Sequence, residues 1–220
     1  SLGFLSSVLL ASPAQADAAN LKGAGSSYAN KFITTCAVND PATAVTYNPG
    51  GSGSGRTAFA NGTVDFGASD AASSITSWSG SRAGYTSSNF SYIPIVGGPI
   101  AVLYQIPGIT TGQLRLDSLT IAKIYSGKIT KWNDPAIAAL QTSAVKSKLP
   151  SNPIRVVYRS ASSGTSENFT DYLRQTAPSV WTKASNETIA SGNPAGRMPA
   201  GSISAANSQA LVASVKSTNG

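Results

Sequence analysis

The chain contains no histidine and only one cysteine among its 220 residues. Histidine-dependent catalytic triads, His-ligated metal sites and zinc fingers are therefore excluded, and a single cysteine cannot close an intrachain disulfide. Cys36 follows Phe32 by four residues and Tyr28 by eight, which is the spacing of one helical face. We therefore expect these three side chains to point inward, with a buried and unreactive thiol at Cys36.

Charge is also scarce, because only 11% of the residues are charged, although the net charge is +7. A basic balance raises nucleic acid as a partner. The sixteen Lys and Arg residues are scattered, however, without a run and without an aromatic-rich RNA-binding signature. We expect no nucleic-acid partner and interpret the charge as an aid to anion capture or to association with a cell wall.

Residues 1–16 carry no charge and end in Ala14-Gln-Ala16. This pattern is typical of the apolar core and cleavage site of a secretory signal peptide, here without a Met or a basic start. The apolar run is too short for a membrane span, and no cysteine follows the cleavage site to carry a lipid. We predict a partial signal peptide over 1–16 and a periplasmic, secreted or cell-surface protein. The alternative is a buried strand or helix.

The most informative stretch is 154–169, IRVVYRSASSGTSENF. Its β-forming start, polar centre and later apolar residues at helical spacing predict a strand, a loop and a helix. The first N–H groups of such a helix lack intrahelical partners and lie at the positive end of the helix dipole, so they can hold an anion. The loop adds the Arg159 guanidinium, hydroxyl groups and Gly164. An ordinary Ser N-cap with glycine in a tight turn is the alternative.

The segment resembles the phosphate-binding proteins of phosphate-specific ABC transporters, in the periplasmic binding protein superfamily. Their signature is Arg, a small residue, Asp, Gly or Ser, and then Ser-Gly-Thr. Four more segments match in the family's order, so the resemblance covers about residues 21–182: 23–28 (GAGSSY), 47–55 (YNPGGSGSG), 64–70 (VDFGASD) and 119–132 with its IYSGKI core.

The resemblance implies a phosphate site and neither a metal nor another cofactor. The implied ligands are hydroxyl, carboxylate, guanidinium and backbone groups of Ser27, Tyr28 (backbone N–H), Ser52, Asp70, Arg159, Ser163, Gly164 (backbone N–H) and Thr165. One position departs from the family, because Ala161 stands where relatives carry the Asp that orients the arginine. Arg155 or an acidic residue elsewhere in the chain would then have to compensate for the missing Asp.

Asp70 is unusual in an anion site, because a carboxylate repels an anion. Phosphate at neutral pH still carries a proton that it can donate to a carboxylate, whereas sulfate carries none. Asp70 therefore predicts selection of phosphate over sulfate. Without the resemblance, a solvated or helix-capping Asp in a turn would be the preferred interpretation.

The expected fold is α/β, a two-lobe periplasmic-binding-protein-like (type II) fold with mainly parallel sheets and an incomplete second half. We predict strands over 21–25, 44–47, 64–67 and 154–157, and a long bent strand over 92–106 that crosses between the lobes. The expected domains are lobe I over 17–95 and lobe II over 96–220. Family members continue past the position of Gly220, so we expect a C-terminally truncated chain.

Helices are predicted wherever a capping residue precedes apolar residues at helical spacing. Expected starts are Ser26 or Ser27, Arg56, Asp117 or Ser118, Lys131 to Pro135, and Ser163, with a weak helix over 207–215. Residues 73–91 are expected to form a surface excursion and 183–204 an irregular region. Trp132 is expected in the core.

The resemblance implies a monomeric binding protein, not an enzyme, which closes on phosphate and delivers it to the membrane subunits of an ABC permease. One alternative is a binder of another oxyanion, sulfate or molybdate. A second is a secreted phosphohydrolase with a serine nucleophile, against which the missing histidine and the lack of a carboxylate cluster both argue. A third is a wall-associated adhesion protein.

Overall fold

The computed structural model describes residues 19–40, 43–72, 80–86, 88–186 and 188–218. The predicted signal peptide and most of the first half of the expected surface excursion lie outside these residues. Within the described ranges, no helix is both long and apolar enough to cross a membrane.

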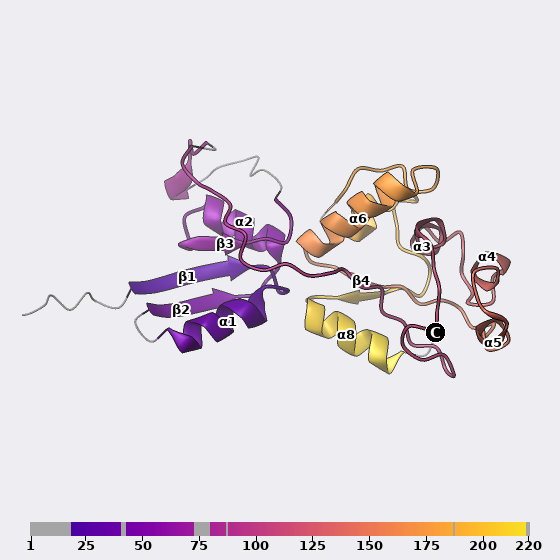
Figure 1. Cartoon of the computed structure of the whole chain (residues 1–220). Helices are drawn as coiled ribbons and strands as arrows, with labels where there is room; N and C mark the ends of the chain where they lie inside the picture. Colours follow the sequence, from indigo (N-terminus) through magenta and orange to yellow (C-terminus); the bar gives the residue numbers. More distant parts are fainter. Residues whose placement is uncertain (1–18, 41–42, 73–79, 87, 187, 219–220) are drawn as a thin grey trace, which may run out of the picture.

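The first sheet has three parallel strands in the order β2-β1-β3. They are β1 (Ala19–Gly25), β2 (Thr43–Asn48) and β3 (Phe66–Ala68). Helices α1 (Asn30–Asn39) and α2 (Ser52–Ala60) follow β1 and β2 and lie on opposite sides of this sheet (Figure 1). A short 3-10 helix, η1 (Gly80–Arg82), lies beside α2. The three predicted strands of the first lobe are therefore confirmed within a few residues.

The second sheet pairs β4 (Val157–Arg159) with β5 (Ile203–Ala205), again in parallel. Each strand runs into a helix, α6 (Gly164–Thr176) after β4 and α8 (Ser208–Ser217) after β5. The two helices lie on either side of β4 (Figure 1). The predicted strand over 154–157 is thus shifted. Ile154 and Val156 are buried, but only residues 157–159 join the ladder.

Two of the helices between the sheets begin at capping carboxylates within the predicted helix starts. Asp117 accepts a hydrogen bond from the Thr120 backbone N–H at 2.7 Å, and α3 (Ser118–Tyr125) follows. Hydrogen bonding to Thr120, first through its side chain and second through this backbone N–H, lowers the pKa of Asp117. Asp134 accepts from the Ala136 N–H at 2.9 Å at the start of α4 (Pro135–Ala138), and α5 (Ser143–Lys146) comes next. Both caps satisfy N–H groups that a helix start leaves without partners.

Two apolar clusters hold the second half of the chain together. One buries Trp132, as predicted, with isoleucines of α3, α4 and the segment before β4. The other packs the fully buried Leu173 and Trp181 against Ala122 and Ile189, and so joins α6 to α3 and to α7 (Ile189–Gly192). Burial of these side chains stabilises the fold by roughly 1.5–3 kcal/mol each. The clusters thereby fix the position of α6 and of the loop before it.

The prediction of a long strand over 92–106 is wrong. Residues 91–103 are extended but outside any ladder, and all of them are exposed. The segment runs from the first sheet to the second (Figure 1). Apolar β-forming residues yield a strand only when a partner strand accepts their backbone hydrogen bonds, and the described residues offer none here.

The prediction of an inward face made of Tyr28, Phe32 and Cys36 is also wrong. Tyr28 is 44% exposed, Phe32 is 42% exposed, and Cys36 is an exposed free thiol. The buried residues are Ala29 and Ile33 instead. The inward face of α1 thus lies one position later along the chain than the expected one.

Candidate functional site

The candidate site lies where the strand ends of both sheets meet the helices that follow them. In parallel sheets these carboxyl ends share one edge, which is where ligands bind in open α/β folds. Turns after β1, β2, β3, β4 and β5 each supply a residue, and side-chain hydrogen bonds join them across the two sheets.

Arg159, the last residue of β4, is at the centre and is 5% exposed. Its Nη1 donates to Ser27 Oγ at 3.1 Å, to Ser208 Oγ at 3.3 Å and, at the limit of hydrogen bonding, to Ser163 Oγ at 3.5 Å. Its Nε and Nη2 are buried and have no partner among the described residues. Burial lowers the pKa of Arg159 and the Asp70 carboxylate raises it. A guanidinium remains protonated in proteins, so a buried cation offers two donors.

Asp70 follows β3 and faces the same turn. Its Oδ2 accepts from Thr165 Oγ1 at 2.7 Å and its Oδ1 accepts from Ser26 Oγ. Its backbone N–H donates to Ser52 Oγ at 3.2 Å, which holds the start of α2 beside it. Burial raises the pKa of Tyr47, and the negative charge of Asp70 raises it further. Asp70 therefore places a negative charge next to the hydroxyls of both sheets.

Two glycines let the turns approach each other. A Cβ on Gly164 would lie 2.8 Å from both Ser52 Oγ and the Ala71 backbone nitrogen. Gly51 has φ +113°, and a Cβ there would overlap the Ser162 carbonyl oxygen and lie 3.3 Å from Arg159 Nη2. Only glycine fits both the conformation and the space at Gly51.

The structure brings together the sequence-predicted positions other than Tyr28, whose side chain is exposed and whose predicted ligand was the backbone N–H. Ser163 is 1% exposed and caps α6, with its Oγ accepting from the Ser166 N–H at 3.4 Å. The Tyr28 N–H, predicted to face the ligand, already donates to Ser26 Oγ at 3.1 Å. Ser27, Ser52, Asp70, Arg159, Gly164 and Thr165 occupy the shared turn region through the contacts given above.

Sequence reasoning missed Ser26 and Ser208. Ser26 is 1% exposed and was expected only as a possible cap. Ser208 is the first residue of α8, which the sequence predicts only as a weak helix over 207–215, and no strand was predicted before it where β5 lies. The run 203–208 (ISAANS) could have indicated Ser208. Its apolar residues, followed by Asn207-Ser208, repeat the pattern of strand, polar turn and helix.

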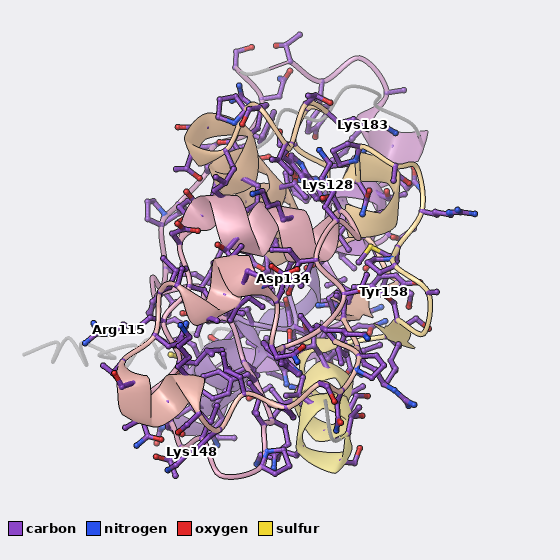
Figure 2. The ribbon with its side chains drawn as sticks, turned by 90° about the vertical axis from the view of Figure 1, so that its right-hand side faces the viewer. Arg115, Lys128, Asp134, Lys148, Tyr158 and Lys183 are labelled. Carbon is purple, nitrogen blue, oxygen red and sulfur yellow. The ribbon has the colours of Figure 1, made fainter. Side chains whose placement is uncertain are left out.

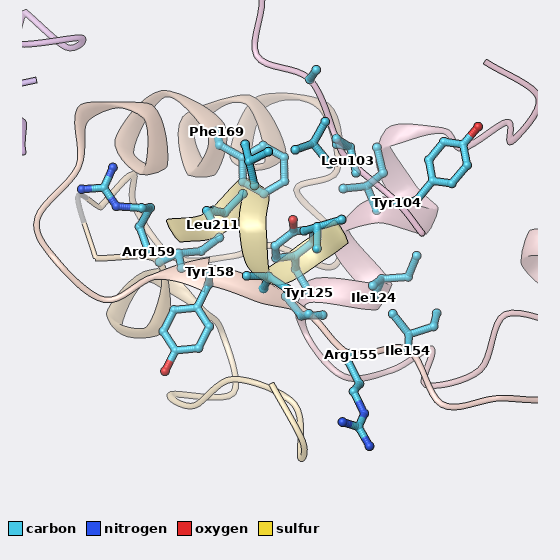
Figure 3. Close-up of a pocket in the computed structure, with 18 of the residues that line it drawn as sticks. Leu103, Tyr104, Ile124, Tyr125, Ile154, Arg155, Tyr158, Arg159, Phe169 and Leu211 are labelled. Atoms are coloured by element: carbon cyan, nitrogen blue, oxygen red, sulfur yellow. The ribbon is translucent and has the colours of Figure 1, made fainter. Parts of the chain in front are cut away.

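Two cavities flank this polar cluster, of about 230 Å³ and about 730 Å³. Thr165 and Ser208 line both, and the larger one also reaches Asp70. The smaller is mainly apolar. Figure 3 shows Leu103, Phe169 and Leu211 gathered in it, while the Arg159 guanidinium points away from this apolar centre. The polar site therefore lies beside the apolar pocket.

Four other basic residues of the second half do not gather into one patch. Figure 2 shows Arg115, Lys128, Lys148 and Lys183 well apart on one face of the molecule. All four are exposed. On this face, the arrangement offers no continuous stripe for a nucleic-acid backbone.

A family model described as a PBP superfamily domain matches residues 11–220, so the chain belongs to that superfamily. Among curated relatives, the phosphate-binding protein PstS2 of Mycobacterium bovis (strain BCG / Pasteur 1173P2) is 40% identical over 162 residues, which is 73% of this chain and 41% of the relative. The phosphate-binding protein PstS 3 of Mycobacterium leprae is 36% identical over 195 residues, covering 88% and 47%. The chain thus spans less than half the length of these relatives.

Solved structures show the same fold. A phosphate-binding protein from Stenotrophomonas maltophilia matches with a TM-score of 0.62 at 24% identity, covering 91% of this chain and 58% of that one. The periplasmic phosphate-binding protein PfluDING, solved with phosphate bound, matches with a TM-score of 0.58 at 22% identity, covering 93% and 55%. The predicted α/β fold with parallel sheets is confirmed, over about half of each solved chain.

Proposed function

We propose that the chain binds inorganic phosphate at the Nε and Nη2 edge of Arg159. The observation that carries this proposal is that this edge is buried and has no hydrogen-bond partner among the residues that the structure describes. A buried, uncompensated charge costs several kcal/mol, so the site favours an anion that supplies the missing acceptors. Nε and Nη2 present two parallel N–H groups, which match two oxygens of one tetrahedral oxyanion.

The surrounding groups suit a phosphate oxyanion. The helices α2 and α6 begin at Ser52 and Gly164, so their first N–H groups and positive dipole ends lie at the site. Each charge-assisted hydrogen bond contributes roughly 1.5–3 kcal/mol, so several suffice for about micromolar affinity after the costs of association. Thr165 and Ser163 supply hydroxyls, and Asp70 accepts the proton that phosphate carries.

Export and transport belong to the same proposal. The uncharged start of the chain favours passage through a secretory pathway, and the curated relatives carry the name phosphate-binding protein. We infer an extracytoplasmic binder that hands phosphate to an ABC permease without catalysing a reaction. The lobes, taken as 17–95 and 96–220, would close by a hinge on the ligand. Contacts between them support this, such as Arg56 Nη2 to Glu167 Oε2 at 3.5 Å.

The direct test is ligand-dependent thermal unfolding of the chain with phosphate and with sulfate. A ligand that binds only the folded state raises the melting temperature in proportion to the logarithm of its concentration. We expect a rise with phosphate at concentrations far above its Kd and none with equal sulfate. Equal shifts with both anions would favour the other-oxyanion alternative, and no shift with either would refute the proposal.

Gly51→Ala is expected to weaken phosphate binding by roughly a hundredfold or more. The added methyl group would overlap the Ser162 carbonyl and crowd Arg159 Nη2, while φ +113° strains any L side chain. Gly108→Ala is the matched control, since Gly108 has φ +77° but no atom within 4 Å of an added Cβ. Calorimetry should show lost affinity in the first variant only. Equal affinities in both variants would contradict the assignment of Gly51.

A further inference from the structure

Ser208 contacts the site from a part of the chain that is far in sequence from the other residues of the site. It is the first residue of α8 and lies 181 positions from Ser27, yet the two Oγ atoms are 2.8 Å apart. Ser208 Oγ also accepts from Arg159 Nη1 at 3.3 Å. The two serines come from turns of different sheets, so their hydroxyl pair joins the two halves of the site.

The Ser208 hydroxyl is available for this contact because its neighbour caps the helix. The Asn207 side chain accepts from the Ala210 backbone N–H at 2.8 Å and satisfies one of the free N–H groups at the start of α8. Ser163 differs, because its Oγ serves as the cap of α6 and its distance of 3.5 Å from Nη1 is at the limit of hydrogen bonding. Ser27 and Ser208 are therefore the principal acceptors of Arg159 Nη1.

We infer that Ser208 is a positioning residue of the phosphate site, which acts by holding Arg159 Nη1 together with Ser27. This inference rests on the proposed function. A guanidinium is planar, so fixing Nη1 also fixes the direction of the Nε and Nη2 edge. Within the described part of the chain, no carboxylate forms an ion pair with Arg159 that could fix it instead.

The hydroxyl hydrogens support the same role. Ser27 and Ser208 have one hydroxyl hydrogen each, and one of the two joins their oxygen atoms. Both oxygens can accept from Nη1, so the second hydrogen remains for the anion. When Ser208 donates to Ser27, Ser27 keeps its own hydrogen for phosphate while both serines hold the arginine. An anion bound there would meet a preorganised arginine and a preorganised hydroxyl, which lowers the cost of ordering them on binding.

The test compares phosphate affinity by calorimetry in the wild-type chain and three single variants. Ser208→Ala should bind phosphate roughly tenfold more weakly, because a hydrogen bond to a charged group is lost. Ser208→Thr keeps the hydroxyl and should stay within about threefold of wild type. Ser217→Ala, on the same helix, removes a hydroxyl that contacts only the Ser214 carbonyl and should change nothing.

A double variant separates positioning from a merely structural role. If Ser27 and Ser208 act as one pair, Ser27→Ala and Ser208→Ala together should cost clearly less than the product of the two single losses. Wild-type affinity in Ser208→Ala, or additive losses, would overturn the inference and leave the proposed function intact. Failure of Ser208→Thr to restore binding would also overturn it. Absence of phosphate binding by the wild-type chain would refute the proposed function itself and, with it, this inference.

Discussion

Arg159→Ala is expected to abolish phosphate binding in calorimetry, a loss of roughly a thousandfold in affinity. Removing one partner of a buried charge pair typically costs about 3–5 kcal/mol, and 1.4 kcal/mol is a factor of ten. Arg159 is the one cation of the described site, and its Nε and Nη2 are the charged donors left for a ligand. No hydroxyl in the site can replace a bidentate guanidinium.

Arg155→Ala is the matched control for that experiment. It removes the same charge four residues earlier, but Arg155 is exposed and points away from the pocket (Figure 3). Its affinity should stay close to wild type. The ligand-free melting temperature of Arg159→Ala should not fall, because the variant no longer buries donors without partners. Equal losses of affinity in the two variants would show that net charge, and not the site, attracts the anion.

Asp70→Asn is expected to let sulfate compete with phosphate. In the wild-type protein, Asp70 repels an anion that cannot donate a proton to it, so sulfate gains nothing to offset that repulsion. The amide removes the negative charge and offers an N–H donor instead. Sulfate should then displace phosphate at concentrations at least tenfold lower than in wild type, measured by competition calorimetry.

A charge-matched control is available for the Asp70 experiment as well. Asp65 is exposed, and its carboxylate accepts from the Lys22 backbone N–H at 2.7 Å, a bond that an Asn side chain can keep. Asp65→Asn changes the net charge by the same amount and should leave the rejection of sulfate unchanged. If Asp70→Asn still rejects sulfate, the proton-based account of selectivity is wrong.

The sequence predicted those elements whose first or last residues have side chains that favour that boundary. Asp117 and Asp134 start helices because their carboxylates satisfy free N–H groups, and that preference acts within a few residues. The run around Arg159 likewise forms a strand, a polar turn and a helix. The predicted site residues lie together because parallel strands present their carboxyl ends on one edge.

The failures come from information that is not local. Residues 92–106 have the composition of a strand, yet a ladder depends on a partner elsewhere in the fold. Which face of α1 turns inward depends on how the helix packs against the sheet, and that packing buries Ile33 and leaves Cys36 exposed. Ser208 was missed because the strand before it, β5, has only three residues and forms a strand by pairing with β4 elsewhere in the fold.

The most direct test of the central claim is an NMR titration of arginine Nε–H groups in the full chain with phosphate. The site proposed here uses the Nε and Nη2 edge of Arg159, which is buried and has no partner in the described structure. We predict a downfield shift and slower solvent exchange for the Arg159 Nε–H, saturating with the calorimetric affinity, and no change for Arg155. Phosphate binding that leaves the Arg159 signal unmoved, or that moves both signals equally, would contradict the account.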